Sequence, residues 1–66
     1  MKLKEALKII ETMRRFKIRN ENLQKIAEGY ASDIKEQLDM NKYEVVKIKD
    51  SEYKSEDYIV IIVKNI

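Results

Sequence analysis

Cysteine and histidine are both absent from this chain of 66 residues, and their absence removes whole classes of chemistry. No disulfide can form, and the usual Cys/His zinc sites are excluded. A Ser-His-Asp triad, a Cys-His pair and a histidine general base are excluded as well. We therefore expect no catalytic centre, no metal site and no other cofactor, and the chain is predicted not to be an enzyme.

Proline is also absent, and Gly29 is the only glycine. One glycine cannot build a Walker loop or a dinucleotide fingerprint, because both need several glycines to let backbone amides approach phosphates. The chain likewise has no linker, repeat or low-complexity segment, so residues 1–66 are predicted to form one domain. Gly29 itself is interpreted as a tolerated surface residue or a point of close packing.

Long apolar runs are lacking too. The longest, Tyr58–Val63, is far shorter than the roughly 18 residues that a membrane span needs. The first eight residues interleave lysine with apolar residues, which is unlike the unbroken apolar core of a signal peptide. We expect a soluble, cytoplasmic protein that has no membrane partner.

Apolar residues recur at helical spacing in two segments. The first predicts an amphipathic helix over residues 2–13, and the second predicts a helix from about residue 21 to 39, with Asn20 as its N-cap. In the second segment the spacing continues through Gly29 without a break. Between the two, residues 15–19 alternate charged and apolar side chains, which indicates a short strand or an extended connector.

The C-terminal part is typical of a β-hairpin, with strands at 43–49 and 58–65 and a turn within 50–57, most simply at 54–57. The predicted fold class is α+β: two amphipathic helices packed on a C-terminal hairpin, in the order α-(β)-α-β-β. A four-residue turn would place Val46 and Ile48 on the helix side with Ile59, Ile61 and Val63. The other face would then carry Tyr43, Val45, Lys47, Lys49 and Tyr53 beside Tyr58, Val60, Ile62 and Lys64.

The last strand is apolar on both faces, so both faces need cover. A core of this size rarely yields more than about 3–5 kcal/mol, and a partner chain is a common remedy. A third strand at residues 15–19 or a second subunit could supply this cover. Of the two we favour a homodimer, or a larger protein partner, that pairs with the edge of this strand or packs on its face and so completes the sheet. The candidate interface residues are Tyr58, Val60, Ile62 and Ile66. The leading hypothesis is a small protein-interaction or regulatory module, of the kind that phages and plasmids encode as accessory proteins.

The alternative hypothesis is nucleic-acid binding. Residues 1–19 contain seven of the 14 basic residues but only two of the 12 acidic ones, although the whole chain has a net charge of +2. Within this part, a basic run with one aromatic ring would suit a phosphate backbone: Arg14, Arg15, Phe16, Lys17 and Arg19. A second set of basic and aromatic residues on one sheet face could support nucleic-acid binding. It consists of Lys47, Lys49 and Lys64 with Tyr43, Tyr53 and Tyr58. The acidic turn Asp50, Glu52, Glu56 and Asp57 lacks the order of a calcium loop and is interpreted as a solvated turn.

Overall fold

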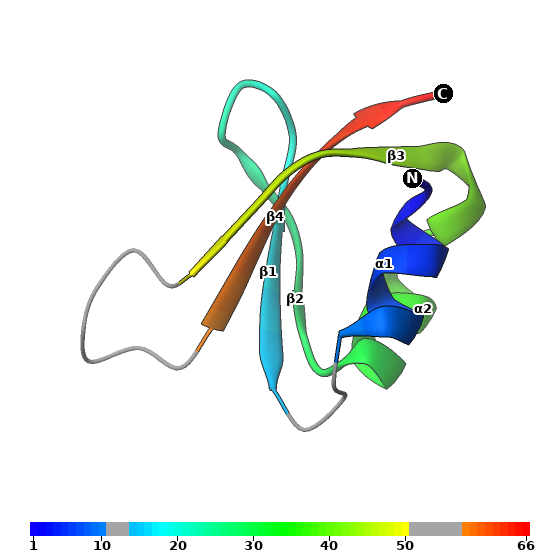
Figure 1. The fold of residues 1–66 in the computed structure, drawn as a ribbon, viewed down its shortest axis with the longest axis vertical. Coiled ribbons are helices and arrows are strands. Elements are labelled where there is room, and N and C mark those ends of the chain that lie inside the picture. The colour runs from blue at the N-terminus through cyan, green and yellow to red at the C-terminus, as the bar shows by residue number, and fades with distance from the viewer. Residues whose placement is uncertain (11–13, 51–57) are drawn as a thin grey trace.

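The computed structural model describes residues 1–10, 14–50 and 58–66, without the side chain of Asp50. Two helices lie together on one face of a four-stranded sheet, which confirms the α+β class (Figure 1). The elements in chain order are α1 (Leu3–Ile9), β1 (Arg15–Arg19), β2 (Lys25–Gly29), α2 (Ala31–Gln37), the 3-10 turn η1 (Met40–Lys42), β3 (Tyr43–Asp50) and β4 (Tyr58–Asn65).

The strand order is β2-β1-β4-β3, with β1 and β4 in the centre. These two central strands run parallel to each other, and each pairs antiparallel with its own hairpin partner. The prediction that β4 offers a free edge to a second chain is therefore wrong. The reason is that residues 15–19, which the sequence left as a strand or a connector, form a strand and pair with β4.

The predicted second helix is wrong over its first half. Residues 25–29 form β2, and α2 covers only Ala31–Gln37. The break lies at Gly29, whose φ of +130° is a conformation that residues with a side chain rarely adopt. A Cβ at this position would lie 2.8 Å from Asp33 Cβ, so Gly29 is a point of close packing. Asp33 in turn accepts a hydrogen bond from the Tyr30 amide at 2.9 Å and so caps the start of α2.

Asn20, the predicted helix N-cap, instead holds the β1–β2 turn. Its Oδ1 accepts hydrogen bonds from the backbone amides of Asn22 and Gln24, both at 3.0 Å. A side chain that suits a helix cap equally suits a turn, because in both cases it replaces missing backbone acceptors. Local sequence alone does not distinguish the two outcomes.

The two C-terminal strands are confirmed as an antiparallel pair, and Lys47 and Lys49 share a face with Val60 and Ile62 as predicted. The register itself differs by two residues from the one that a turn at 54–57 would give. Lys47 pairs with Ile62, Ile48 with Ile61 and Lys49 with Val60. A bulge at Val46 then shifts the register, so that Val45 pairs with Val63. The prediction that Tyr43 and Val45 lie on the helix-free face is therefore wrong, since the bulge turns both toward the core.

Helix α1 reaches only the beginning of β3, where the Val45 amide donates to the Met1 carbonyl at 2.7 Å. Val46 and Ile48 lie beyond this cover and remain 49% and 42% exposed, which contradicts the prediction that they pack on the helices. The core itself lies between the helices and the central strands. It is formed by Leu3, Leu7, Phe16, Ile18, Ala27, Ile34, Ile59, Ile61 and Val63.

Candidate functional site

The helix-free side of the sheet gathers cations that are far apart in the sequence. Phe16 and Ile18 are fully buried against the helices, so strand alternation places Arg15, Lys17 and Arg19 on the opposite side. Residues that pair across strands share this side. We call it the basic face, and define it by Arg15, Lys17, Arg19, Lys25, Glu28, Glu44, Lys47, Lys49, Tyr58, Val60, Ile62 and Lys64.

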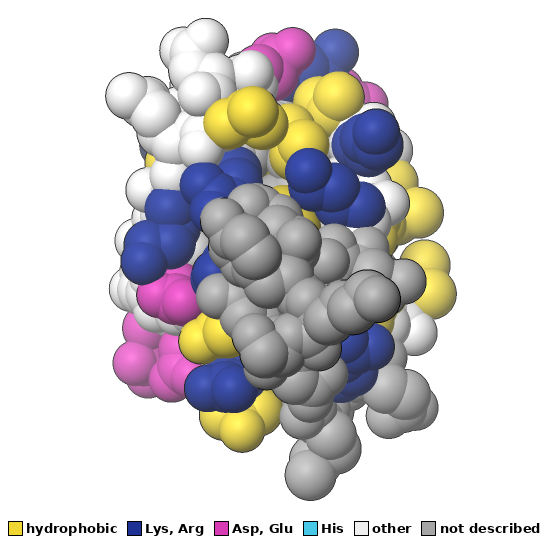
Figure 2. All heavy atoms as spheres, turned by 90° about the vertical axis from the view of Figure 1, so that its left-hand side faces the viewer, with side chains coloured by type: hydrophobic (Ala, Val, Ile, Leu, Met, Phe, Trp, Pro, Cys, Tyr) yellow, Lys and Arg dark blue, Asp and Glu magenta, His cyan; other side chains and the backbone are white. Residues whose placement is uncertain are grey.

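Two rows cross the basic face from β1 to β3. In one row Val60 lies between Lys17 and Lys49; in the other Ile62 lies between Arg19 and Lys47. Neighbouring strands are about 4.8 Å apart, so the two lines of cations run about 10 Å from each other with apolar side chains between them. Figure 2 shows this side of the molecule, with several Lys and Arg side chains in dark blue.

Among the described residues, the acidic groups of the basic face lie at its edge strands. Glu28 on β2 pairs with Lys25 at 2.8 Å, and Glu44 on β3 lies 3.8 Å from Lys64. The two central strands contribute cations and apolar residues to this face but no carboxylate. The described part of the two central strands therefore presents cations without carboxylates on this face, although the chain as a whole has a net charge of only +2.

Tyr58 connects the strands of the basic face. The Arg15 guanidinium carbon and the Lys17 Nζ each lie 4.6 Å from the centroid of the Tyr58 ring, within the range of a cation–π interaction. The pKa of Glu28 is lowered, chiefly by the hydrogen bond from Lys25 and also by the Lys25 charge. A hydrogen bond from Tyr58 and the Lys17 charge lower this pKa further, while desolvation raises it. The Tyr58 side chain thus extends from β4 across β1 to β2.

The four predicted interface residues do not form one exposed patch. Tyr58, Val60 and Ile62 share the basic face, as their alternation predicts, but Val60 is fully buried and Tyr58 and Ile62 are half-buried. Ile66 lies beyond β4 and is 70% exposed. A strand that is apolar on both faces is typical of the centre of a sheet, and this chain buries Val60 without a second copy.

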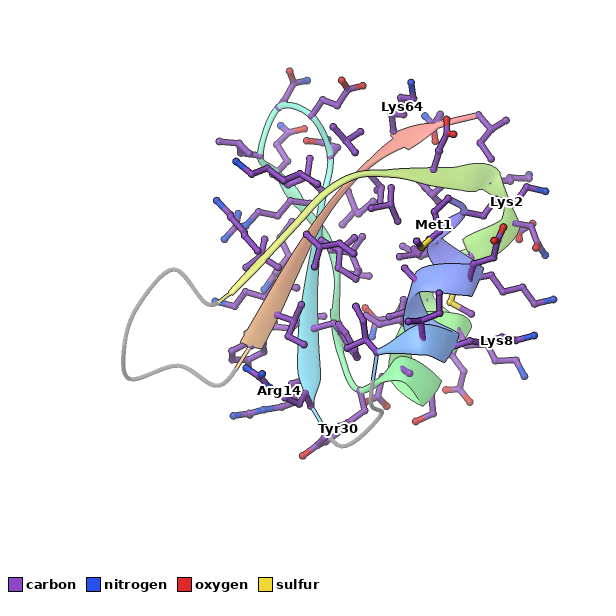
Figure 3. All side chains as sticks on the ribbon, in the orientation of Figure 1. Met1, Lys2, Lys8, Arg14, Tyr30 and Lys64 are labelled. Atoms are coloured by element: carbon purple, nitrogen blue, oxygen red, sulfur yellow. The ribbon has the colours of Figure 1, made fainter. Side chains whose placement is uncertain are left out.

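The residues predicted to bind nucleic acid also lie in different parts of the structure. The basic face holds Arg15, Lys17 and Arg19 on one side of β4 and Lys47 and Lys49 on the other. Phe16 cannot stack on a base, because it is fully buried among the core residues. Arg14 precedes β1 and is half-buried (Figure 3). Tyr43 belongs to the helix side, while Tyr53 and the acidic turn lie outside the described residues.

Sequence reasoning missed Lys25 and Glu28, because residues 25–29 were assigned to a helix. The signal that would have found them is the single glycine. A glycine two residues before a helix that begins at Ala31 marks a strand-to-helix turn at least as well as a helix interior.

No family model matches this sequence, and no curated protein or solved structure matches it significantly. Within the described ranges, no helix is long and apolar enough to cross a membrane. The same ranges contain no cluster of three or more acidic side chains arranged to hold a metal ion.

Proposed function

We propose that this chain is a small non-enzymatic protein that binds single-stranded nucleic acid on the basic face. The observation that supports the proposal best is the convergence of two distant basic segments. Arg15, Lys17 and Arg19 come from one end of the chain, Lys47 and Lys49 from the other, and they flank the central strand β4.

The arrangement suits a single strand for a physical reason. Cations along β1 and β3 would neutralise phosphates and release counterions, which is the main source of affinity for nucleic acids. Unpaired bases have apolar faces that would lie on Tyr58 and Ile62 between the two lines of cations. In a duplex the bases are stacked inside and do not reach such a surface. Since phosphate contacts carry no sequence information, we expect broad sequence tolerance.

The test is fluorescence anisotropy with labelled single-stranded DNA and RNA of mixed sequence, and with the matching duplexes, at several salt concentrations. We expect both single strands to bind more tightly than the duplexes. Log affinity should fall linearly with log salt, by about 0.7 for each phosphate contacted on a single strand. Absence of binding to either single strand at low salt would overturn the proposal.

A charge-matched pair of variants separates the basic face from general electrostatics. Lys47→Glu with Lys49→Glu changes two exposed positions on the face, whereas Lys8→Glu with Lys35→Glu changes two exposed positions on the helices. Figure 3 shows Lys8 on the helix side of the molecule. Both variants change the net charge by the same amount. Only the first should abolish binding and flatten the salt dependence; equal losses in both would contradict a localised site.

A protein-interaction role that includes homodimerisation is the second candidate function. It is favoured by the exposed Val46 and Ile48 on the edge strand β3. Light scattering across a dilution series tests it: a stable dimer that Ile48→Lys converts to a folded monomer would support pairing along β3. A monomer at all concentrations would exclude self-association as the role of these residues.

A further inference from the structure

We propose that Leu23, at the tip of the β1–β2 hairpin, inserts between neighbouring bases of the strand that lies on the basic face. This inference rests on the proposed function and adds a contact to it. It starts from two properties of one residue: Leu23 is 55% exposed, and its φ is +64°.

A positive φ of this kind is common for glycine and tolerated by asparagine, but it is a genuine outlier for a bulky residue. Leu23 is the only residue other than glycine with positive φ among those described. An exposed leucine in this conformation lowers the stability of the turn and contributes nothing to the core. Strained residues of this type cluster at functional sites, where a contact with a ligand accounts for the side chain.

The turn holds Leu23 firmly. The Leu23 amide donates to the Asn20 carbonyl at 2.9 Å, and the Asn20 amide donates to the Gln24 carbonyl at 3.0 Å. The Asn20 side chain adds bonds to Gln24 through both its oxygen and its nitrogen. A side chain carried by such a cross-linked turn is pre-organised, so little conformational entropy is lost when it makes a contact.

The position of the turn connects Leu23 to the basic face. The Arg19 guanidinium donates to the Leu23 carbonyl at 2.8 Å, and Arg19 pairs across the hairpin with Lys25. Both cations belong to the basic face and directly flank the turn. A strand whose phosphates follow β1 therefore reaches Leu23 beyond the last pair of cations. Leucine is one of the apolar side chains that minor-groove proteins insert between base steps of duplex DNA, and the same contact is open to a single strand.

The experiment compares wild type with Leu23→Asn and Leu23→Met. Asparagine tolerates the positive φ, so Leu23→Asn should melt no lower than wild type, while methionine keeps an apolar side chain. On a single-stranded oligonucleotide with an internal 2-aminopurine, we expect Leu23→Asn to bind about tenfold more weakly, the size of a lost base contact. Its salt dependence should equal that of wild type, because no phosphate contact is lost.

The fluorescence of the 2-aminopurine reports insertion directly. Wild type and Leu23→Met should raise it by unstacking the probe, and Leu23→Asn should not. Wild-type affinity and fluorescence in Leu23→Asn would overturn this inference but leave the proposed function intact, provided that the β3 lysine pair is still required. A weaker salt dependence in Leu23→Asn would also overturn it, since Leu23 would then act by positioning Arg19. Failure of wild type to bind any strand would overturn both proposals.

Discussion

Tyr58 and Arg15 face each other across the two central strands, with the Arg15 guanidinium carbon 4.6 Å from the centroid of the Tyr58 ring. The two residues are 43 positions apart, and only the parallel pairing of β1 with β4 brings them together. The sequence grouped Tyr58 with the lysines of the C-terminal strands and expected Phe16 to serve the basic run of residues 14–19. This contact shows that the Tyr58 ring lies against the cations of β1 as well.

Replacing Tyr58 tests whether its ring contacts a base. Tyr58→Phe keeps the ring and should bind single strands nearly as tightly as wild type. Tyr58→Leu removes the ring and should weaken binding by roughly 1–3 kcal/mol, the usual contribution of one stacked base. Anisotropy titrations of both variants check this, with melting curves to show that both are folded. Equal affinities would mean that the ring makes no contact with the nucleic acid.

Stability should fall in acid partly because of Glu28. Lys25 holds the pKa of Glu28 below its ordinary value of 4.5, so the carboxylate stabilises the fold above the unfolded pKa. This contribution is lost as the pH falls through the lower pKa of the folded state. Carboxyl NMR titration should show a pKa below 4.5 that rises toward that value in Lys25→Met. A Glu28 pKa that is unchanged in this variant would exclude Lys25 as the cause.

Gly29→Ala should destabilise the protein by roughly 1–3 kcal/mol or more. The backbone at this position has a φ of +130°, and the new Cβ would lie 2.8 Å from Asp33 Cβ. Chemical denaturation measures the change, with Ser32→Ala as the matched control on the exposed side of α2. The control should stay within about 0.5 kcal/mol of wild type. A Gly29→Ala variant as stable as wild type would show that the β2–α2 turn rearranges freely.

Val60 and Val46 are a matched pair of valines that tests whether the chain by itself buries Val60 on the basic face. Val60 is fully buried and Val46 is 49% exposed, although both lie in β-strands. Val60→Ala should lower the free energy of unfolding by roughly 1.5–3 kcal/mol, whereas Val46→Ala should change it by less than 1 kcal/mol. Urea unfolding at low protein concentration checks both. Equal effects, or an effect of Val60→Ala that depends on protein concentration, would indicate that a second copy buries Val60.

Much of the local structure follows from the sequence. The apolar spacing in residues 2–13 predicts α1, although the helix ends at Ile9 and Ile10 is already extended. The alternation in residues 15–19 indicates β1. The strands at 43–49 and 58–65 are likewise predicted from β-branched and aromatic residues between polar segments. In each case the signal lies within the segment itself. A helix or strand that buries one face has apolar residues repeated at the period of that element.

The second helix shows where such signals fail. Ile26 and Ala27 have helical spacing relative to Ile34, but they pack on the core from a strand. The bulge at Val46 is similar, since one extra residue in a strand leaves no mark in the sequence yet turns Tyr43 and Val45 to the other face.

The sequence by itself determined the class of fold, the absence of Cys and His chemistry, and which residues alternate along β1 and β4. Only the tertiary structure decided that β1 and β4 lie side by side, so that Lys17 and Lys49 flank Val60 from opposite sides. The physical reason is distance along the chain. Strand pairing is satisfied by backbone hydrogen bonds that any residue except proline can make, so the choice of neighbour depends on the packing of the whole core.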